Sequence, residues 1–416
     1  MNLRILTISD NPNIFSGLAK VHRNVIDGMI AAGHEVCIAG WFAFDSKTTA
    51  MIAHGYKPQR PTYKGIEILP MAKNENSPLA AHDICKIVKP DVVVTIGDHW
   101  SFYYMHAVKN KLDYKFKWVA YLTVEEEDID EVKWKPLFRY MDAVAIPTIF
   151  GKSSLSKIGV QSKLIPYGVD EIFKPASIEE RARLRSARGL SNDTVRMVTV
   201  AQNTLRKNLP SILQTAQILK ANRQGQRFKF HIHTNIGAAD SNETCVFRLQ
   251  KIAAKLGVED MITFAPQDNS LFNGSPAELV RDEYNASDFY LSTSFSEGYG
   301  LPIVEAMACG VPCWANGTST LYEMVGLCYG QTGVGPRGYI FKSRTDILPP
   351  EKFVNMVDPS LLAWELDKEM ETVRKRKMQT DCENYARRST WEGMGLELAE
   401  LIAQMEKRTV IPVEEI

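Results

Sequence analysis

The 416-residue sequence contains no long hydrophobic run. A helix that crosses a bilayer needs about 20 consecutive apolar residues, and no stretch of about 18 occurs here. The residues from Met1 to Ile8 already read as the start of a strand. We therefore expect neither a signal peptide nor a transmembrane helix, and a cytoplasmic protein.

Cysteines are few and carry no recognisable spacing. The seven are odd in number, and no two form a Cys-x-x-Cys pair. This pattern indicates neither a disulfide framework nor a zinc site, so we expect reduced, packed thiols.

Net charge is also absent, because 49 Lys+Arg residues balance 49 Asp+Glu residues. Basic clusters at 109–117 and 374–377 are typical of solvated faces, so charge alone indicates no nucleic-acid partner. The composition, 45% hydrophobic and 24% charged, is that of a soluble globular protein. A chain of this length is expected to form two domains of roughly 150–200 residues each.

The most informative stretch of the chain covers residues 293–313, TSFSEGYGLPIVEAMACGVPC. It predicts a strand end, a glycine loop, a buried helix and a further strand. Pro302 suits the first helical turn, and Gly310 suits the end of the helix. Two carboxylates, Glu297 in the loop and Glu305 in the otherwise apolar helix, need partners.

Glu305 has two interpretations. It can complement the positive N-terminus of its own helix, an effect worth about 0.3–1 kcal/mol. It can also contact a ligand, and the neighbouring glycines favour this second interpretation. Gly298 and Gly300 have no Cβ, so a ligand can approach the backbone, and their N–H groups lie beside a helix N-terminus, where an anion is favoured.

Units of strand, loop and helix are expected in the first half of the chain. A strand over 3–9 precedes a polar loop and a helix over 18–32, and further strands are expected over 92–96 and 116–122. Polar residues that follow such strands face the ligand crevice of a doubly wound sheet. The candidates at these strand ends are Gly17, His99 and Glu125. Their plainer interpretations are a tight turn, a structural histidine and an acidic helix start.

The second half repeats the pattern. After a strand over 196–201, Arg206 and Lys207 precede a helix. Helix starts prefer acids, so two cations there are better explained by an external anion than by a solvated basic turn. Gln267 follows another strand, expected over 261–265.

The run from Ser296 to Pro312, with its two glutamates eight positions apart around Gly-Tyr-Gly-Leu-Pro, resembles the signature of the retaining GT-B glycosyltransferase superfamily, of the family 4-like, nucleotide-sugar-dependent kind. Tyr167-Gly-Val-Asp170 is similar to the interdomain linker of that superfamily. The resemblance implies an α/β fold of two Rossmann-like, doubly wound parallel-sheet domains facing a central cleft, with a C-terminal helix crossing back to the first domain. The expected segments are an acceptor-side domain over 1–170, a nucleotide-sugar-binding domain over 171–385 and the C-terminal helix over 386–416.

The resemblance also implies residue roles. Lys207 matches the lysine that grips the donor diphosphate, and Arg206 is the candidate to replace the family arginine, because Ala201-Gln202 stand where a glycine and that arginine are usual. Similarly, Ser16-Gly17 stand where two glycines are usual. The expected catalytic residues are Glu297, Lys207, Arg206 and His99. The expected donor-binding residues are Glu305, Gly298, Tyr299, Gly300, Leu301, Gly17, Gln267 and Glu125.

The activity that the resemblance implies is transfer of a sugar from a nucleoside-diphosphate sugar, UDP- or GDP-linked, to a hydroxyl acceptor, with retention and without a required metal or cofactor. The expected acceptor is a glycan, a lipid or a small molecule. The sequence leaves open a hydroxylated base in DNA as acceptor, a sugar-nucleotide 2-epimerase and a non-catalytic sugar-nucleotide sensor. Asp128-x-Asp130 also resembles the metal-binding carboxylate pair of the GT-A fold, with ligands suited to Mg²⁺ or Mn²⁺, although an acidic start to a helix is simpler.

Overall fold

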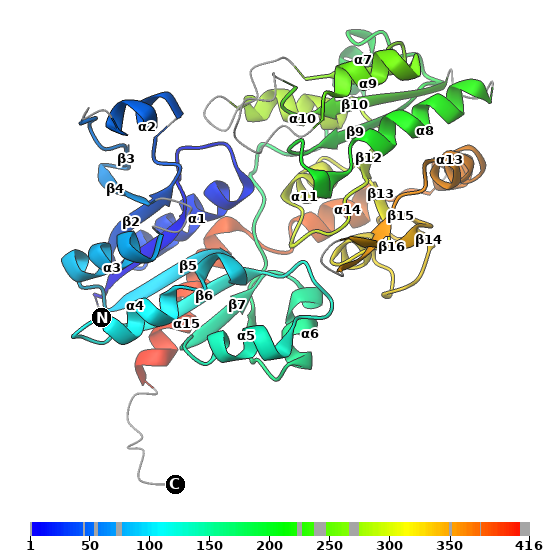
Figure 1. The fold of residues 1–416 in the computed structure, drawn as a ribbon. Coiled ribbons are helices and arrows are strands. Elements are labelled where there is room, and N and C mark those ends of the chain that lie inside the picture. The colour runs from blue at the N-terminus through cyan, green and yellow to red at the C-terminus, as the bar shows by residue number, and fades with distance from the viewer. Residues whose placement is uncertain are drawn as a thin grey trace. The chain divides into compact units, whose positions relative to one another are not determined.

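The protein consists of two compact units. The computed structural model describes residues 2–44, 46–53, 57–71, 77–222, 227–236, 247–265, 274–348, 352–374 and 376–407. Unit 1 comprises Met1–Gly168 with Ser389–Ile416, and unit 2 comprises Val169–Arg388. Each unit is a parallel sheet covered by helices (Figure 1).

Unit 1 is built on a sheet with the strand order β3-β4-β2-β1-β5-β6-β7-β8. Neighbouring strands are parallel except β3 and β4. From β1 the chain continues to β2 on one side, whereas β5 lies on the other, so the sheet has a topological switch point at β1 and β5. The strands are β1 Arg4–Asp10, β2 Glu35–Trp41, β3 Thr62–Tyr63, β4 Ile66–Met71, β5 Val92–Asp98, β6 Lys117–Thr123, β7 Ala143–Ile146 and β8 Lys163–Leu164.

The helices of unit 1 begin and end where the sequence supplies capping residues. The Ser16 hydroxyl accepts the Ala19 N–H at 3.0 Å and so begins α1, which spans Gly17–Ala31. Gly33, with φ +81°, follows its end in the left-handed conformation. The other helices are α2 Ser46–Ala53, α3 Ser77–Val88, the 3₁₀ turn η1 His99–Phe102, α4 Met105–Lys111, α5 Glu131–Phe138, α6 Ile149–Lys157 and α15 Trp391–Lys407.

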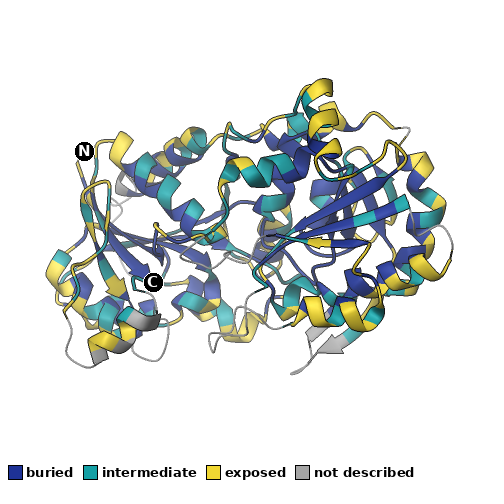
Figure 2. Cartoon of the chain, turned by 90° about the horizontal axis from the view of Figure 1, so that it is seen from above, coloured by how far each residue is buried: buried dark blue, intermediate teal, exposed yellow. Residues whose placement is uncertain are grey.

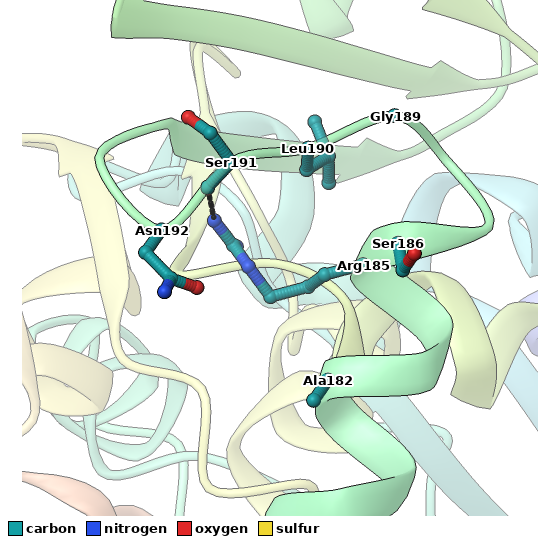
Figure 3. Close-up of a pocket in the computed structure, with 7 residues that line it drawn as sticks. All are labelled: Ala182, Arg185, Ser186, Gly189, Leu190, Ser191 and Asn192. Carbon is teal, nitrogen blue, oxygen red and sulfur yellow. Dashed lines mark hydrogen bonds between the residues drawn. The ribbon is translucent and has the colours of Figure 1, made fainter.

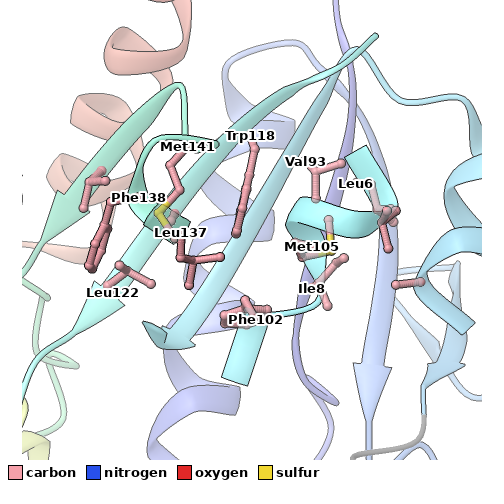
Figure 4. Packing of buried hydrophobic residues seen from close by; sticks show 14 of the residues in the cluster. Leu6, Ile8, Val93, Phe102, Met105, Trp118, Leu122, Leu137, Phe138 and Met141 are labelled. Atoms are coloured by element: carbon pink, nitrogen blue, oxygen red, sulfur yellow. The ribbon is translucent and has the colours of Figure 1, made fainter. Parts of the chain in front are cut away.

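The core of unit 1 on one face of its sheet is made of large apolar side chains. Trp118 and Leu122 on β6 are buried together with Leu137 and Phe138 of α5 (Figure 4). Trp118 is fully buried, and its indole N–H donates to Thr95 Oγ1 at 2.9 Å, so its polar atom is satisfied. The central strands are therefore fixed by burial on both faces, as their continuous apolar runs predict.

Helix α15 returns to unit 1 from the end of unit 2 and crosses α1 closely. A Cβ at Gly28 would lie 2.5 Å from the Gly395 Cα, and a Cβ at Gly395 would lie 2.7 Å from the Gly28 Cα. Only glycine allows this approach. At the start of α15, Trp391 stacks on Tyr167 with ring centroids 6.2 Å apart.

Unit 2 repeats the architecture with the strand order β11-β10-β9-β12-β13-β15-β14. All neighbouring pairs are parallel except β14 with β15, and the separate hairpin β16–β17 is antiparallel. The strands are β9 Val195–Val200, β10 Phe228–His233, β11 Ile262–Phe264, β12 Phe289–Ser292, β13 Cys313–Asn316, β14 Gly333–Gly335, β15 Gly338–Phe341, β16 Arg344–Leu348 and β17 Lys352–Met356.

The helices of unit 2 cover both faces of this sheet (Figure 1). Buried residues occupy the strands and the inner helix faces, and exposed residues occupy the outer faces (Figure 2). The helices are α7 Ile178–Ser186, the 3₁₀ turn η2 Leu205–Lys207, α8 Pro210–Ala221, α9 Leu249–Leu256, α10 Ala277–Asn285, α11 Leu301–Ala308, α12 Leu321–Val325, α13 Pro359–Arg374 and α14 Gln379–Ala386.

A buried ion pair sits inside unit 2. Arg196 on β9 is buried and donates to the Glu283 carboxylate and to the Ser287 hydroxyl at 2.9 Å. Arg188 donates to the same carboxylate at 2.7 Å. Burial raises the pKa of Glu283, but these cations outweigh it and lower that pKa to about 2.

Among the described helices, none combines the length and the apolar character that a bilayer crossing requires. After β5 the chain forms η1 and then α4, which begins at Met105. The loop between them keeps Phe102 in the core beneath Trp41, with ring centroids 5.2 Å apart.

Candidate active site in unit 2

The candidate site lies where β9 and β12 end. These strands are neighbours, but the chain continues from β9 to β10 on the other side, which makes this position the topological switch point of unit 2. Ligands of doubly wound sheets bind beyond the carboxyl ends of the strands at such a point. The loop after β9 carries Arg206 and Lys207, and the loop after β12 carries Glu297.

Three predicted residues meet there. Lys207 donates from Nζ to Glu297 Oε1 at 2.5 Å, and Arg206 donates to Glu297 Oε2 at 3.1 Å. Each carboxylate oxygen therefore has its own cation. The Ser294 hydroxyl donates to Oε1 as well, at 2.7 Å. The Glu297 side chain is 7% exposed, the Lys207 side chain 14% and the Arg206 side chain 36%, so Arg206 is the most accessible of the three.

The two cations decide the protonation of Glu297. Burial raises the pKa of its carboxyl, but Lys207 and Arg206 outweigh burial and lower the pKa to about 2. A carboxylate of this kind remains ionised at neutral pH. With both oxygens engaged, it is a weak base and a weak nucleophile.

Backbone contacts hold the cation loop against the Glu297 loop. The Thr293 hydroxyl donates to the Lys207 carbonyl at 2.9 Å, and the Phe295 N–H donates to the Arg206 carbonyl at 2.9 Å. After Lys207, Asn208 takes the left-handed conformation with φ +48°, and Pro210 begins α8. The side chains are thus presented from a short, backbone-bonded turn.

The glycine loop leads from Glu297 into α11. Gly300 has φ +84°, and a Cβ there would lie 3.1 Å from the Met324 Cε, so both the backbone and the available space favour glycine. Helix α11 begins at Leu301, with Pro302 in its first turn. Gly298 and Tyr299 are buried between Glu297 and the helix start. The positive end of α11 therefore lies directly after the Glu297 loop.

Glu305 lies on α11 among apolar side chains and is 8% exposed. Its Oε2 accepts the Tyr284 hydroxyl at 3.2 Å. This partner comes from α10, not from the N-terminus of α11, so the carboxylate does more than complement its own helix. The structure places Glu305 in the second turn of the helix that the glycine loop begins.

Gly17, His99 and Glu125 belong to unit 1, and each follows or begins an element at the carboxyl edge of that sheet. Gly17 is the exposed first residue of α1. Beside it, the Ser16 hydroxyl donates to Asp10 Oδ2 at 2.6 Å, so a carboxylate stands near the first turn of α1. Glu125 is half-buried in the segment between β6 and α5.

His99 is the first residue of η1, directly after β5, and is buried. Its ring meets Trp134 edge to face with centroids 4.6 Å apart. Within the described residues, neither ring nitrogen has a hydrogen-bond partner. Burial lowers the pKa of His99 to about 4, with Lys133 adding to the shift and Glu126 opposing it, so the ring is neutral at pH 7.

The acidic run at 125–130 directly precedes α5. Asp130 accepts the Lys133 N–H at 3.0 Å and so caps α5, while the Asp128 side chain is 92% exposed and lies 3.6 Å from Lys157. Across the described ranges, no group of three or more His, Cys, Asp or Glu side chains is arranged to hold a metal ion. Gln267, the remaining predicted residue, lies outside the described residues.

A pocket of about 320 Å³ lies away from these residues, between the end of α7 and β9. Arg185 crosses it and donates to the Ser191 carbonyl at 2.9 Å (Figure 3). The same guanidinium also donates to the Thr194 carbonyl at 2.7 Å and to Asp288 at 3.1 Å. Arg185 is therefore occupied in holding the loop before β9.

The loop after β13, residues 317–320, also touches the candidate site, and sequence reasoning did not find it. The Ser319 hydroxyl accepts the Glu297 N–H at 2.8 Å. The two residues are 22 positions apart, and only the adjacency of β12 and β13 brings them together. The sequence signal is limited to a Thr-Ser-Thr run after an expected strand.

Comparison with known proteins finds a family model that matches part of unit 2. Residues 180–346 match the family model described as Glycosyl transferases group 1. This segment contains Arg206, Lys207, Glu297 and Glu305.

Individual relatives match a similar part of the chain. A D-inositol 3-phosphate glycosyltransferase of Geodermatophilus obscurus is 27% identical over 163 residues, which are 39% of this chain and 34% of that protein. An alpha-monoglucosyldiacylglycerol synthase of Streptococcus pneumoniae is 26% identical over 195 residues, 44% of this chain and 40% of that protein. The chain spans about a third of the length of the first of these curated relatives.

Solved structures match over nearly the whole chain. Sucrose-phosphate synthase from Thermosynechococcus elongatus superposes with a TM-score of 0.73 at 15% identity, covering 98% of this chain and 100% of that one. Anabaena HepE, in complex with UDP and glucose, superposes with a TM-score of 0.67 at 14% identity, covering 97% of this chain and 100% of that one. At such identities the likeness concerns the fold alone.

Proposed function

Because the chain belongs to the GT-B glycosyltransferase superfamily, we propose that it is a retaining glycosyltransferase that uses a nucleoside-diphosphate sugar and a hydroxyl acceptor. One arrangement carries this proposal. Lys207 and Arg206 converge on Glu297 at the switch point of unit 2, directly before the positive N-terminus of α11. Cations and a helix N-terminus at one strand edge suit a diphosphate.

The reaction breaks the bond between the anomeric carbon and the diphosphate oxygen, and negative charge develops on that oxygen. Lys207, Arg206 and the N–H groups at the start of α11 stabilise the charge, each charge-assisted hydrogen bond contributing about 1.5–3 kcal/mol. The acceptor oxygen bonds to the anomeric carbon on the face that the diphosphate leaves. Its proton passes to the departing phosphate, so configuration is retained.

Glu297 then serves as a positioning and charge-stabilising group near the donor sugar. The low pKa of its carboxyl, about 2, disfavours the role of covalent nucleophile. Glu305 accepts hydrogen bonds from the donor ribose. In unit 1, neutral His99 and Glu125 contact the sugar or the acceptor, and the Gly17 loop contacts the donor.

No metal is needed in this scheme, because two cationic side chains carry the diphosphate charge. Transfer that is abolished by a chelator and restored by Mn²⁺ would instead assign a role to the acidic run that contains Asp128 and Asp130. One matched relative is named a D-inositol 3-phosphate glycosyltransferase and another an alpha-monoglucosyldiacylglycerol synthase, and these names favour a small-molecule or lipid acceptor over DNA.

The experiment begins with the donor. UDP-, GDP- and ADP-sugars are tested for a rise in the melting temperature of the protein, and the best donor is then offered with glycan, lipid and hydroxylated-DNA acceptors. A UDP- or GDP-sugar that raises the melting temperature and is consumed supports the proposal. Binding without consumption of any donor indicates a sensor, and an epimerised sugar separated by chromatography before mass spectrometry indicates a 2-epimerase.

A further inference from the structure

The last residue of β13 and the loop after it hold the Glu297 loop by three side-chain hydrogen bonds. Asn316 donates from Nδ2 to the Ser294 carbonyl at 3.0 Å. Thr318 donates to the Phe295 carbonyl at 2.7 Å. The Ser319 bond to the Glu297 N–H completes the set.

Ser319 makes its bond from an unfavourable backbone conformation. Its φ is +40°, a left-handed value that residues with a Cβ rarely adopt. Ser319 is also buried. The strain is retained together with a hydrogen bond to the backbone of Glu297, whose carboxylate both cations contact.

The hairpin β16–β17 fixes this loop from the opposite side. The Asn355 side chain on β17 donates to the Gly317 carbonyl, and Asn316 Nδ2 donates to the Asn355 carbonyl at 2.5 Å. One amide group of Asn316 thus bonds to both the hairpin and the Glu297 loop. The family match ends at residue 346, so most of the hairpin lies beyond the matched segment.

These contacts form a continuous chain of bonds from the hairpin to the cations. We propose that Asn316, Thr318, Ser319 and Asn355 are positioning residues, a brace that holds Glu297 between Lys207 and Arg206. On the opposite side, the Glu297 loop is already bonded to the cation loop through Thr293 and Phe295. The brace therefore completes the support of the Glu297 loop. The catalytic effect of the brace rests on the function proposed above.

Two substitutions at one position separate the bond from the strain. Ser319→Ala removes the acceptor and keeps the strain, whereas Ser319→Gly removes both. If Ser319 only forms a turn, Ser319→Gly retains full activity. If Ser319 positions Glu297, both variants lose donor turnover, while Ser319→Gly melts at or above the temperature of Ser319→Ala.

Asn355→Ala tests the hairpin, and Arg344→Ala is its matched control. Arg344 lies on the same hairpin, with a side chain 71% exposed. We expect Ser319→Ala and Asn355→Ala to reduce kcat for donor consumption about tenfold, because each removes one hydrogen bond of the brace that positions Glu297. The Kd for the nucleoside diphosphate alone should change less than twofold, because the cation loop keeps its bonds to Thr293 and Phe295.

Hydrogen exchange of the free protein tests the brace without any donor. In Ser319→Ala and Asn355→Ala, peptides covering 293–300 should exchange faster than in wild type, and in Arg344→Ala they should not. Unchanged exchange in Ser319→Ala and Asn355→Ala overturns the proposal. If the wild type is active, variants that exchange faster but keep the full wild-type kcat overturn it as well. Faster exchange in a protein that consumes no nucleotide sugar supports the brace and overturns the proposed function instead.

Discussion

Glu297→Gln gives the sharpest test of the charge arrangement, because the contribution of this carboxylate to stability depends on pH. Its pKa is about 2 in the folded protein against 4.5 for an ordinary glutamate. A carboxyl whose pKa is lower in the folded protein stabilises the fold at pH values above its pKa in the unfolded chain. This stabilisation is lost as the pH falls through the pKa of the folded protein. The difference corresponds to about 3 kcal/mol at pH 7 and about 1 kcal/mol at pH 3.

The substituted amide does not titrate, so wild type should exceed Glu297→Gln in unfolding free energy by about 3 kcal/mol at pH 7 and by about 1 kcal/mol at pH 3. Glu283 also has a pKa of about 2, but it is present in both proteins and cancels. Unfolding in urea, monitored through the hydrogen exchange of peptides from β12 and β13, gives the unfolding free energy of unit 2 separately. Glu259→Gln, at an exposed position, is the control and should stay within about 0.5 kcal/mol of wild type.

A difference that stays constant between pH 7 and pH 3, or grows as pH falls, would refute the reasoning. It would mean that Glu297 is not held as an ion-paired carboxylate. A difference that shrinks with falling pH, whatever its absolute size, has the predicted sign.

Three further substitutions test the fold around the site. Gly28→Ala places a Cβ against Gly395 and should lower the unfolding free energy of unit 1 by about 1–3 kcal/mol in urea; equal stability would show that the helices can separate without cost. Arg196→Met leaves Glu283 buried with one cation fewer, and a melting curve should show a loss of about 3 kcal/mol at pH 7 that shrinks as the pH falls below 4.5. Gly300→Ala forces a Cβ into left-handed backbone, and calorimetry should show a loss of about 1–2 kcal/mol; an unchanged melting temperature would contradict the conformation assigned to the glycine loop.

The sequence predicted most of the fold because hydrophobic periodicity and capping residues are local. The strands expected over 3–9 and 196–201 lie within one residue of β1 and β9, and the GT-B fold is confirmed. The hairpin β16–β17 and the helices α13 and α14 were not predicted. Short strands with polar residues, such as Arg344–Leu348, give a weak periodic signal.

The candidate site likewise has parts that the sequence predicts and parts that it does not. The glycine loop and the two glutamates are contiguous, so their chemistry could be recognised from the sequence. The partners of Glu305 and Glu297 could not, because Tyr284 and Ser319 reach these residues only through the packing of helices and neighbouring strands. The convergence of Lys207 and Arg206 on Glu297 likewise depends on β9 lying beside β12. Strand order of this kind is a property of the whole sheet.

The central claim is that Lys207 holds the diphosphate of a nucleotide sugar. The direct measurement is the rate of donor consumption by wild type, Lys207→Ala and Lys220→Ala, across UDP- and GDP-sugars. Lys220 lies on α8 with a side chain 45% exposed, and its substitution controls for the loss of a lysine. We predict that Lys207→Ala loses at least about 100-fold in kcat/KM and that Lys220→Ala stays within about twofold of wild type. A Lys207→Ala variant that consumes the donor at the wild-type rate would contradict the account.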